Sequence, residues 1–179
     1  SVLSVLNSGY LRIRAGELLD KIHNERDRLD KVRRIKSVKM VVDLTSKEEN
    51  SNVFSLVGVR DRLFLSNLHS IFETVEDNLF DPIRVTTGDE EILFGEGFKN
   101  KSVVLYTSDD RVVEITDKLV KFVNTTDGEW KKAVGLATYG SRVYLLDKEN
   151  GKIWKYLKER DNYGGAETYS DEINLTNPI

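Results

Sequence analysis

The sequence contains no cysteine, only two prolines and two histidines, and no long apolar run. The absence of cysteine excludes a cysteine nucleophile, a thiolate zinc site, an iron–sulfur cluster and a disulfide framework. The two histidines, His23 and His69, cannot supply a three-histidine metal centre within one chain. No apolar run reaches about 18 residues, the length at which a segment becomes a candidate membrane span.

The 179 residues are 39% hydrophobic and 32% charged, and this composition excludes a disordered or low-complexity chain. The formal net charge of −3 is unevenly distributed: residues 1–36 carry nine basic and five acidic side chains, and the remaining residues carry 18 and 25. An acidic main body argues against a nucleic-acid partner, because phosphates require clustered lysine and arginine. The short basic cluster at residues 33–36 is typical of a solvated helix end, with contact to an anionic surface as the alternative.

Residues 1–36 form an N-terminal segment in which an amphipathic helix is predicted over residues 11–35. Its apolar positions recur in alternating steps of four and three and so lie on one face of the helix. Two interpretations remain open: the helix packs on the body of the same protein, or it forms a short coiled-coil seam. Six of the seven positions of this stripe are apolar, and the polar Glu25 weakens the coiled-coil interpretation; the positions are Leu11, Ala15, Leu18, Ile22, Glu25, Leu29 and Val32.

From Val38 onward, short runs of β-branched and aromatic residues alternate with turn residues, which is a strand-and-turn pattern. This pattern repeats: Leu63, Val103 and Val143 are spaced 40 and 40 residues apart. In each repeat, one run precedes this one, and a second run follows it after a turn. In the first two repeats a fourth run comes last. In the third repeat the fourth run, residues 166–169, is weaker.

Four short strands about every 40 residues are typical of the blade of a β-propeller. We therefore predict a mainly β fold: a partial β-propeller of about three four-stranded repeats behind an N-terminal α-helix. The repeats occupy about 53–88, 89–132 and 133–179 of a region that spans 37–179. Because propellers typically have about four to eight blades, we expect either further propeller sequence beyond this chain or copies that associate. An ordinary meander or sandwich of about ten strands is the rival fold.

A recurring signature is dense toward the C-terminus, at residues 127–134, 139–140, 143–147, 150–156 and 160–164. On these residues the chain resembles the β-propeller regions of uncharacterised, membrane-anchored proteins of candidate-phyla (Patescibacteria-type) bacteria. The resemblance covers residues 127–169 densely and the upstream part more loosely. It implies that more propeller follows residues 175–178 and that the chain lies on the extracytoplasmic face of a bacterial membrane, anchored by sequence outside this chain. It implies no catalytic residues.

Chemical motifs are scarce. Gly95-Glu96-Gly97 lacks the third glycine and the lysine of a phosphate-binding loop. The acidic clusters at 89–91, 109–110 and Asp147 with Glu149 are interpreted as solvated turn residues, and both histidines as surface residues. We therefore predict no catalytic, cofactor-binding or metal-binding residues and no cofactor.

Aromatic residues are interpreted as packing between neighbouring repeats, rather than as a stacking surface for nucleic acid. These residues are Trp130, Trp154, Tyr144, Tyr156 and Tyr163.

Together these features predict a non-catalytic interaction or scaffold module that recognises a protein partner, or further copies of itself, through loops at one rim. The loop at residues 158–165 is the best candidate for a functional insertion because it breaks the repeat. One alternative is a structural subunit that self-assembles through its helix and open blade faces, as a homo-oligomer. The other is a propeller enzyme of the lactonase or lyase type whose site lies outside this fragment.

Overall fold

The computed structural model describes residues 12–32, 37–49 and 52–170, which belong to two compact units, Ser1–Met40 and Val41–Ile179. The predicted mainly β chain with one α-helix and three antiparallel sheets is confirmed.

The first unit contains helix α2, Arg12–Leu29. It ends before residue 35, the predicted end, because Lys31 adopts the left-handed conformation with a φ of 54° that closes many helices. Arg26 and Arg28 occupy the last turn, where positive charge suits the helix dipole. Ala15 is buried, whereas Leu18, Ile22 and Leu29 of the apolar stripe are exposed. The two interpretations of this stripe stay predictions, and the basic cluster at 33–36 lies outside the described residues.

The first sheet of the second unit follows a short 3-10 turn, η1, at Leu44–Ser46. Its strands are β1 (Ser55–Val59), β2 (Arg62–Ser66), β3 (Ser70–Val75), β4 (Asn78–Leu79) and β5 (Ile83–Arg84). Both β4 and β5 pair with β3, so the expected fourth strand is split into two short pieces. Pro82 lies between them and cannot donate a ladder hydrogen bond, which explains the interruption.

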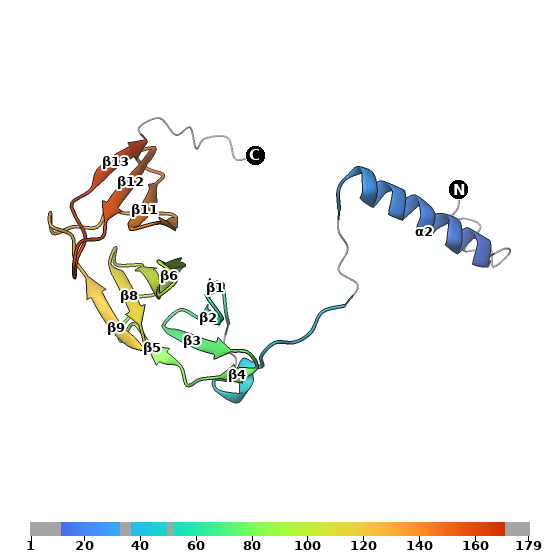
Figure 1. Ribbon diagram of the computed structural model, residues 1–179, viewed down its shortest axis with the longest axis horizontal. Coiled ribbons are helices and arrows are strands. Elements are labelled where there is room, and N and C mark those ends of the chain that lie inside the picture. Colours follow the sequence, from blue (N-terminus) through green and yellow to red (C-terminus); the bar gives the residue numbers. More distant parts are fainter. Residues whose placement is uncertain (1–11, 33–36, 50–51, 171–179) are drawn as a thin grey trace. The chain divides into compact units, whose positions relative to one another are not determined.

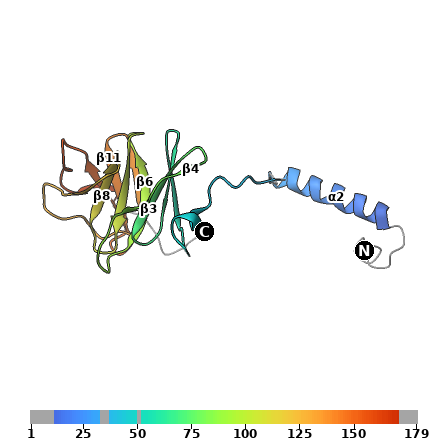
Figure 2. The same ribbon diagram turned by 90° about the horizontal axis from the view of Figure 1, so that it is seen from below.

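The second and third sheets are four-stranded meanders, each with one register shift, at Ile92/Phe94 and at Ile153/Trp154. The second contains β6 (Ile92–Phe98), β7 (Ser102–Thr107), β8 (Val112–Thr116) and β9 (Leu119–Val123). The third contains β10 (Leu136–Tyr139), β11 (Arg142–Asp147), β12 (Lys152–Leu157) and β13 (Glu167–Ser170). Within this unit the sheets fan out in sequence order (Figure 1), and the first strands β1, β6 and β10 lie side by side. Figure 2 shows the same sheets from below.

The second sheet packs on both of its neighbours. Alternate residues of β7 point to opposite faces, and all six residues of this strand are buried. Val103 and Leu105 belong to the core shared with the first sheet, whereas Val104 and Tyr106 belong to the core shared with the third sheet. The hydrophobic core of the unit is therefore two layers, one on each side of the middle sheet.

The predicted packing of aromatic residues between repeats is confirmed in the second of these layers for Trp130, Trp154, Tyr156 and Tyr163, and it is wrong for Tyr144, whose ring contacts Tyr169 of its own sheet. Tyr156 and Tyr163 are fully buried, and the Trp130 ring lies 4.5 Å from the first and 5.2 Å from the second, measured between ring centroids. The indole Nε1 of Trp130 donates to Val123 O at 2.8 Å, so the ring is held at the end of β9. Trp154 packs against the same cluster.

The loop at 158–165 lies between β12 and β13 of the third sheet and contacts the end of the second sheet through hydrogen bonds. Tyr163 donates its N–H to Asn124 O at 2.9 Å and accepts from the N–H of Thr126 at 2.9 Å. Its ring fills the core between Phe98 and Trp130. The departure from the repeat, which we interpreted as a functional insertion, therefore has a structural explanation.

Candidate functional site

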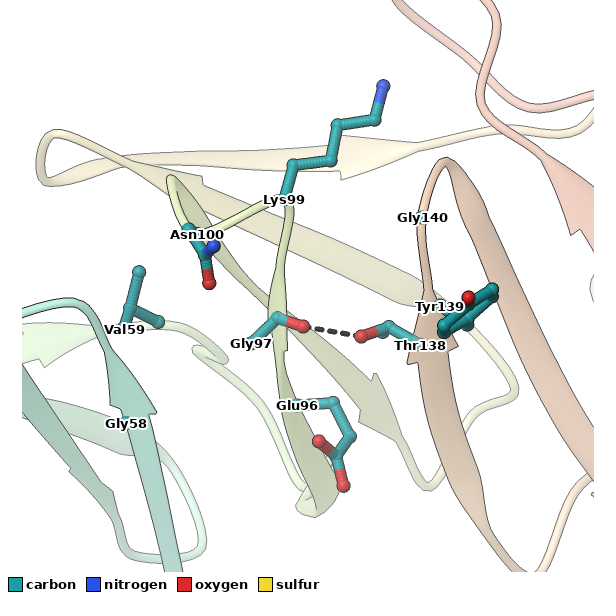
Figure 3. Close-up of a pocket in the computed structure, with 9 residues that line it drawn as sticks. All are labelled: Gly58, Val59, Glu96, Gly97, Lys99, Asn100, Thr138, Tyr139 and Gly140. Atoms are coloured by element: carbon teal, nitrogen blue, oxygen red, sulfur yellow. Dashed lines mark hydrogen bonds between the residues drawn. The ribbon is translucent and has the colours of Figure 1, made fainter.

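A groove of about 370 Å³ crosses the inner strands of all three sheets (Figure 3). It lies where these strands end and their first hairpin turns begin, so each sheet contributes one stretch of its wall. The lining residues are Gly58, Val59, Glu96, Gly97, Lys99, Asn100, Thr138, Tyr139 and Gly140.

Close main-chain approach builds the floor of the groove. A Cβ atom on Gly97 would lie 3.0 Å from Gly58 O, so β1 and β6 can approach this closely only because residue 97 has no side chain. On the other side, the Thr138 hydroxyl donates to Gly97 O at 2.5 Å (Figure 3). The missing side chain of Gly97 therefore lets the first sheet pack closely on the second. The Gly97 carbonyl accepts the hydrogen bond that links the second sheet to the third.

The hairpin turns hold the side chains of the rim. Lys99 and Asn100 both adopt positive φ, 53° and 51°, in the three-residue turn 99–101 between the paired residues Phe98 and Ser102. Gly140 has a φ of 57° in the corresponding turn of the third sheet. In Figure 3, the side chains of Lys99 and Glu96 extend in opposite directions from the second sheet, and the Tyr139 ring lies on the third.

The groove offers polar and stacking groups to solvent. Glu96 supplies a carboxylate, Lys99 an ammonium group and Asn100 an amide, and all three are exposed. Tyr139 is 77% exposed, and its phenol ring presents both an apolar face and a hydroxyl. A carboxylate, an ammonium group, an amide and an aromatic ring on one concave surface can bind a polypeptide segment.

Sequence reasoning missed this site. It considered residues 95–97 only as a failed phosphate loop, although a glycine at 97 next to a repeat-related Gly58 signals close backbone approach. The missing signal was the alignment of strand ends: Val59, Phe98 and Tyr139 each pair with the first residue of the following strand. That alignment places the three first hairpin turns at one rim.

The histidines lie apart from the groove lining. The Nδ1 atom of His69 lies 3.1 Å from both Thr86 Oγ1 and Glu90 O, so this half-buried ring holds the end of the first sheet. His23 is exposed on α2.

The acidic turn residues differ in their environments. Asp109 accepts from the Thr107 hydroxyl at 2.6 Å and pairs with Arg111, and Asp89, Glu91 and Glu149 are exposed or half-buried, as expected of turn residues. The prediction of a solvated residue is wrong for Asp147, which is only 5% exposed.

Asp147 closes the β11–β12 turn from within. It accepts hydrogen bonds from Trp154 Nε1 at 3.0 Å and from the N–H of Asn150 at 2.9 Å. Burial raises the pKa of this carboxyl, but the hydrogen bonds from Trp154 and Asn150 outweigh burial and hold the pKa below its ordinary value. Asn67 and Thr107, 80 and 40 residues earlier, are also buried at the ends of β2 and β7, so the same position closes each turn.

Within residues 12–32, 37–49 and 52–170, no cluster of three or more histidine, aspartate or glutamate side chains is placed to hold a metal ion. In this same part of the chain, no helix has both the length and the apolar character needed to cross a membrane.

No model of a known protein family and no curated protein matches the chain. Several solved structures are similar to it at low identity. Three of them are the N-terminal domain of Nup159 (12% identity, 69% of this chain and 31% of that chain, TM-score 0.46), AztD from Citrobacter koseri (13%, 70% and 36%, 0.49) and a luciferin-regenerating enzyme (14%, 74% and 48%, 0.43). The chain thus spans about a third to a half of the length of these structures.

Proposed function

We propose that this chain is a non-catalytic interaction module of the β-propeller type, which binds a polypeptide segment of a protein partner in the groove. The observation that carries the proposal is the groove itself, because one concave surface takes residues from all three sheets. A rigid sheet platform fixes these residues relative to one another, and loops at its rim supply the contacts.

The propeller assignment is supported by the stacking of the three sheets. A four-stranded sheet with two apolar faces cannot cover both alone, and the middle sheet is covered on both sides by its neighbours. The first strands of successive sheets lie at the centre of the fan, as the inner strands of blades do (Figure 1).

The setting of the module is part of the proposal. The resemblance over residues 127–169 favours a larger, membrane-anchored bacterial protein in which this region serves as a scaffold on the extracytoplasmic face. The anchor then belongs to sequence outside this chain, and the groove faces a partner in that compartment.

A library of random linear peptides, displayed on phage, tests the proposal directly. We expect the purified chain to enrich peptides whose binding falls at least about tenfold, or 1.4 kcal/mol, in the variants Glu96→Gln and Lys99→Glu. Lys148→Glu is the matched control, because this exposed lysine lies in the β11–β12 turn, outside the groove lining.

Two results would contradict the proposal. One is a selection in which no peptide is enriched above background. The other is a set of enriched peptides that bind Glu96→Gln, Lys99→Glu and the control equally, because such peptides occupy a different surface.

A further inference from the structure

The third sheet has an apolar face that points away from the second sheet. Residues that pair across β10, β11 and β12 alternate between two faces, and Val143, Leu145 and Tyr156 point to the shared core. The opposite face contains an apolar hollow of about 220 Å³. The hydrophobic and aromatic residues of this outward face are Ala137, Tyr139, Tyr144, Leu146, Ile153 and Leu157.

The outward face of the third sheet is equivalent, in the repeat, to the face of the second sheet that packs against the third sheet. By strand register, Tyr139 corresponds to Phe98, and Leu146 with its partner Ile153 corresponds to Tyr106 with its partner Val112. In the second sheet these positions are at most 1% exposed because the third sheet covers them. In the third sheet Tyr139 is 77% exposed, and Leu146 and Ile153 are half-buried rather than fully covered.

The complementary half of such an interface lies at the other end of the stack. The face of the first sheet that points away from the second carries Leu56, Leu63 and Leu65 on β1 and β2. Leu56 is 65% exposed, and Leu63 and Leu65 are half-buried. Farther out, Phe72 and Thr74 of β3 are already buried, so the open part of this face is its inner half.

Charge is also complementary between the two faces. Where the second sheet meets the third, Glu114 of β8 pairs with Lys158, the residue that follows β12. At the outward face of the third sheet, the position of Glu114 is taken by Lys155, which pairs with Glu167 of β13 at 2.7 Å, and in the first sheet the position of Lys158 is taken by Glu76. Both charges are reversed relative to Glu114 and Lys158, so Glu76 of a facing first sheet would have the sign opposite to that of Lys155.

We propose that two copies of this chain associate around a two-fold axis, the third sheet of each packing on the first sheet of the other. The result is a closed ring of six sheets, within the range of about four to eight blades that propellers have. Both interfaces continue the stacking already present between the second and third sheets. The association uses the faces at the two ends of the stack and shares Tyr139 with the groove, but it does not involve the groove contacts of Glu96 and Lys99. Its failure therefore leaves the proposed function standing.

Mass measurement by light scattering tests the proposal on the full chain. We expect twice the 20.5 kDa of one chain, and one chain mass for Leu146→Glu, Leu157→Glu and Leu56→Glu. Two changes on the third sheet guard against the misfolding of either one. Leu119→Glu is the matched control, since this leucine is 70% exposed on β9 and belongs to neither face, and it should leave the dimer intact.

A mixing experiment identifies which faces meet. Leu146→Glu retains an intact first sheet, and Leu56→Glu retains an intact third sheet, so a mixture of the two variants forms one sound interface per pair. We expect dimers in the mixture although each variant alone is a monomer.

Three results would overturn the proposal. A wild-type chain that stays monomeric at high concentration leaves the face to a different occupant, such as a further sheet of a longer protein. A dimer that persists in all three glutamate variants forms through another surface, such as the exposed stripe of α2. A mixture that stays monomeric shows that these two faces do not meet.

Discussion

Lys158 Nζ lies 2.5 Å from Glu114 Oε2, and this ion pair joins the chain after β12 to the middle of β8 in the neighbouring sheet. The two side chains are only 12% and 16% exposed. Glu114 also accepts from the Ser102 hydroxyl at 3.1 Å, and the Lys158 ammonium lies 4.6 Å from the centroid of the Tyr163 ring. The pair is therefore held by further polar and cation–π contacts in a largely desolvated place.

Replacing Lys158 with methionine is expected to lower the free energy of unfolding by about 3 kcal/mol, because it leaves Glu114 buried and unpaired. Urea denaturation measures this change. The double variant Lys158→Met/Glu114→Gln should recover much of the loss, since both charges are then absent. The exposed pair of Lys132 with Glu149 supplies the control, and Lys132→Met should change stability little. Equal effects of the two methionine variants would contradict the prediction.

Two substitutions of Tyr163 are expected to have opposite outcomes. Its hydroxyl is buried without a hydrogen-bond partner in the part of the chain that the structure describes. Tyr163→Phe removes this group and should leave stability unchanged or raise it by up to about 1 kcal/mol. Tyr163→Ala opens a cavity beside Phe98 and Trp130 and should cost about 3–5 kcal/mol. Thermal unfolding of both variants decides, and a large loss in Tyr163→Phe would reveal a partner for the hydroxyl.

Asp147 should make stability depend on pH in the acid range. Because hydrogen bonds hold its folded pKa below the unfolded value of about 3.9, its stabilisation is complete above the unfolded pKa and disappears as pH falls through the folded pKa. Asp147→Asn should lower stability at neutral pH by about 1–2 kcal/mol and flatten this acid dependence. Urea midpoints between about pH 2 and pH 7 measure both effects, and the same change at Asp61, an exposed turn residue, should produce neither.

Gly97→Ala should separate the inner strands at the groove. The added methyl group meets Gly58 O at 3.0 Å, a main-chain atom that can move only with β1. We expect a loss of about 1–3 kcal/mol in the free energy of unfolding. Gly16→Ala in α2 is the control and should raise the free energy of unfolding, because nothing lies within 4 Å of its added Cβ and alanine favours a helix. A Gly97→Ala variant as stable as wild type would show that the strands can separate freely.

Local pattern predicted most of the strands and the packing of aromatic residues between repeats, but not the specific contacts where the sheets meet. The 40-residue spacing and the alternating apolar runs were sufficient for three antiparallel sheets, because strands that follow one another along the chain pair with short turns. The sequence shows that Pro82 interrupts a strand. Whether the proline ends that strand or splits it into two depends on whether both pieces pair with β3, as β4 and β5 do.

The burial of Tyr163 and the groove itself depend on contacts between different sheets. A carboxylate in a turn sequence is solvated by default, but Asn150 and Trp154 of the same β11–β12 hairpin donate hydrogen bonds to Asp147. The loop that carries Tyr163 looked like an insertion because its partner, the strand end at Asn124, lies about one repeat away in sequence. No single repeat contains the contacts that bury Tyr163 or build the groove.

The complete burial of β7 gives the module an order of disassembly. Amide protons of Val103 to Tyr106 can exchange with solvent only after a neighbouring sheet has detached, whereas strands of the outer sheets can open on their own. In a single chain, a protease is therefore expected to cut the first and third sheets before the second. Replacement of a whole outer repeat during evolution is correspondingly easier than any change to the middle one, whose side chains must fit two neighbours at once.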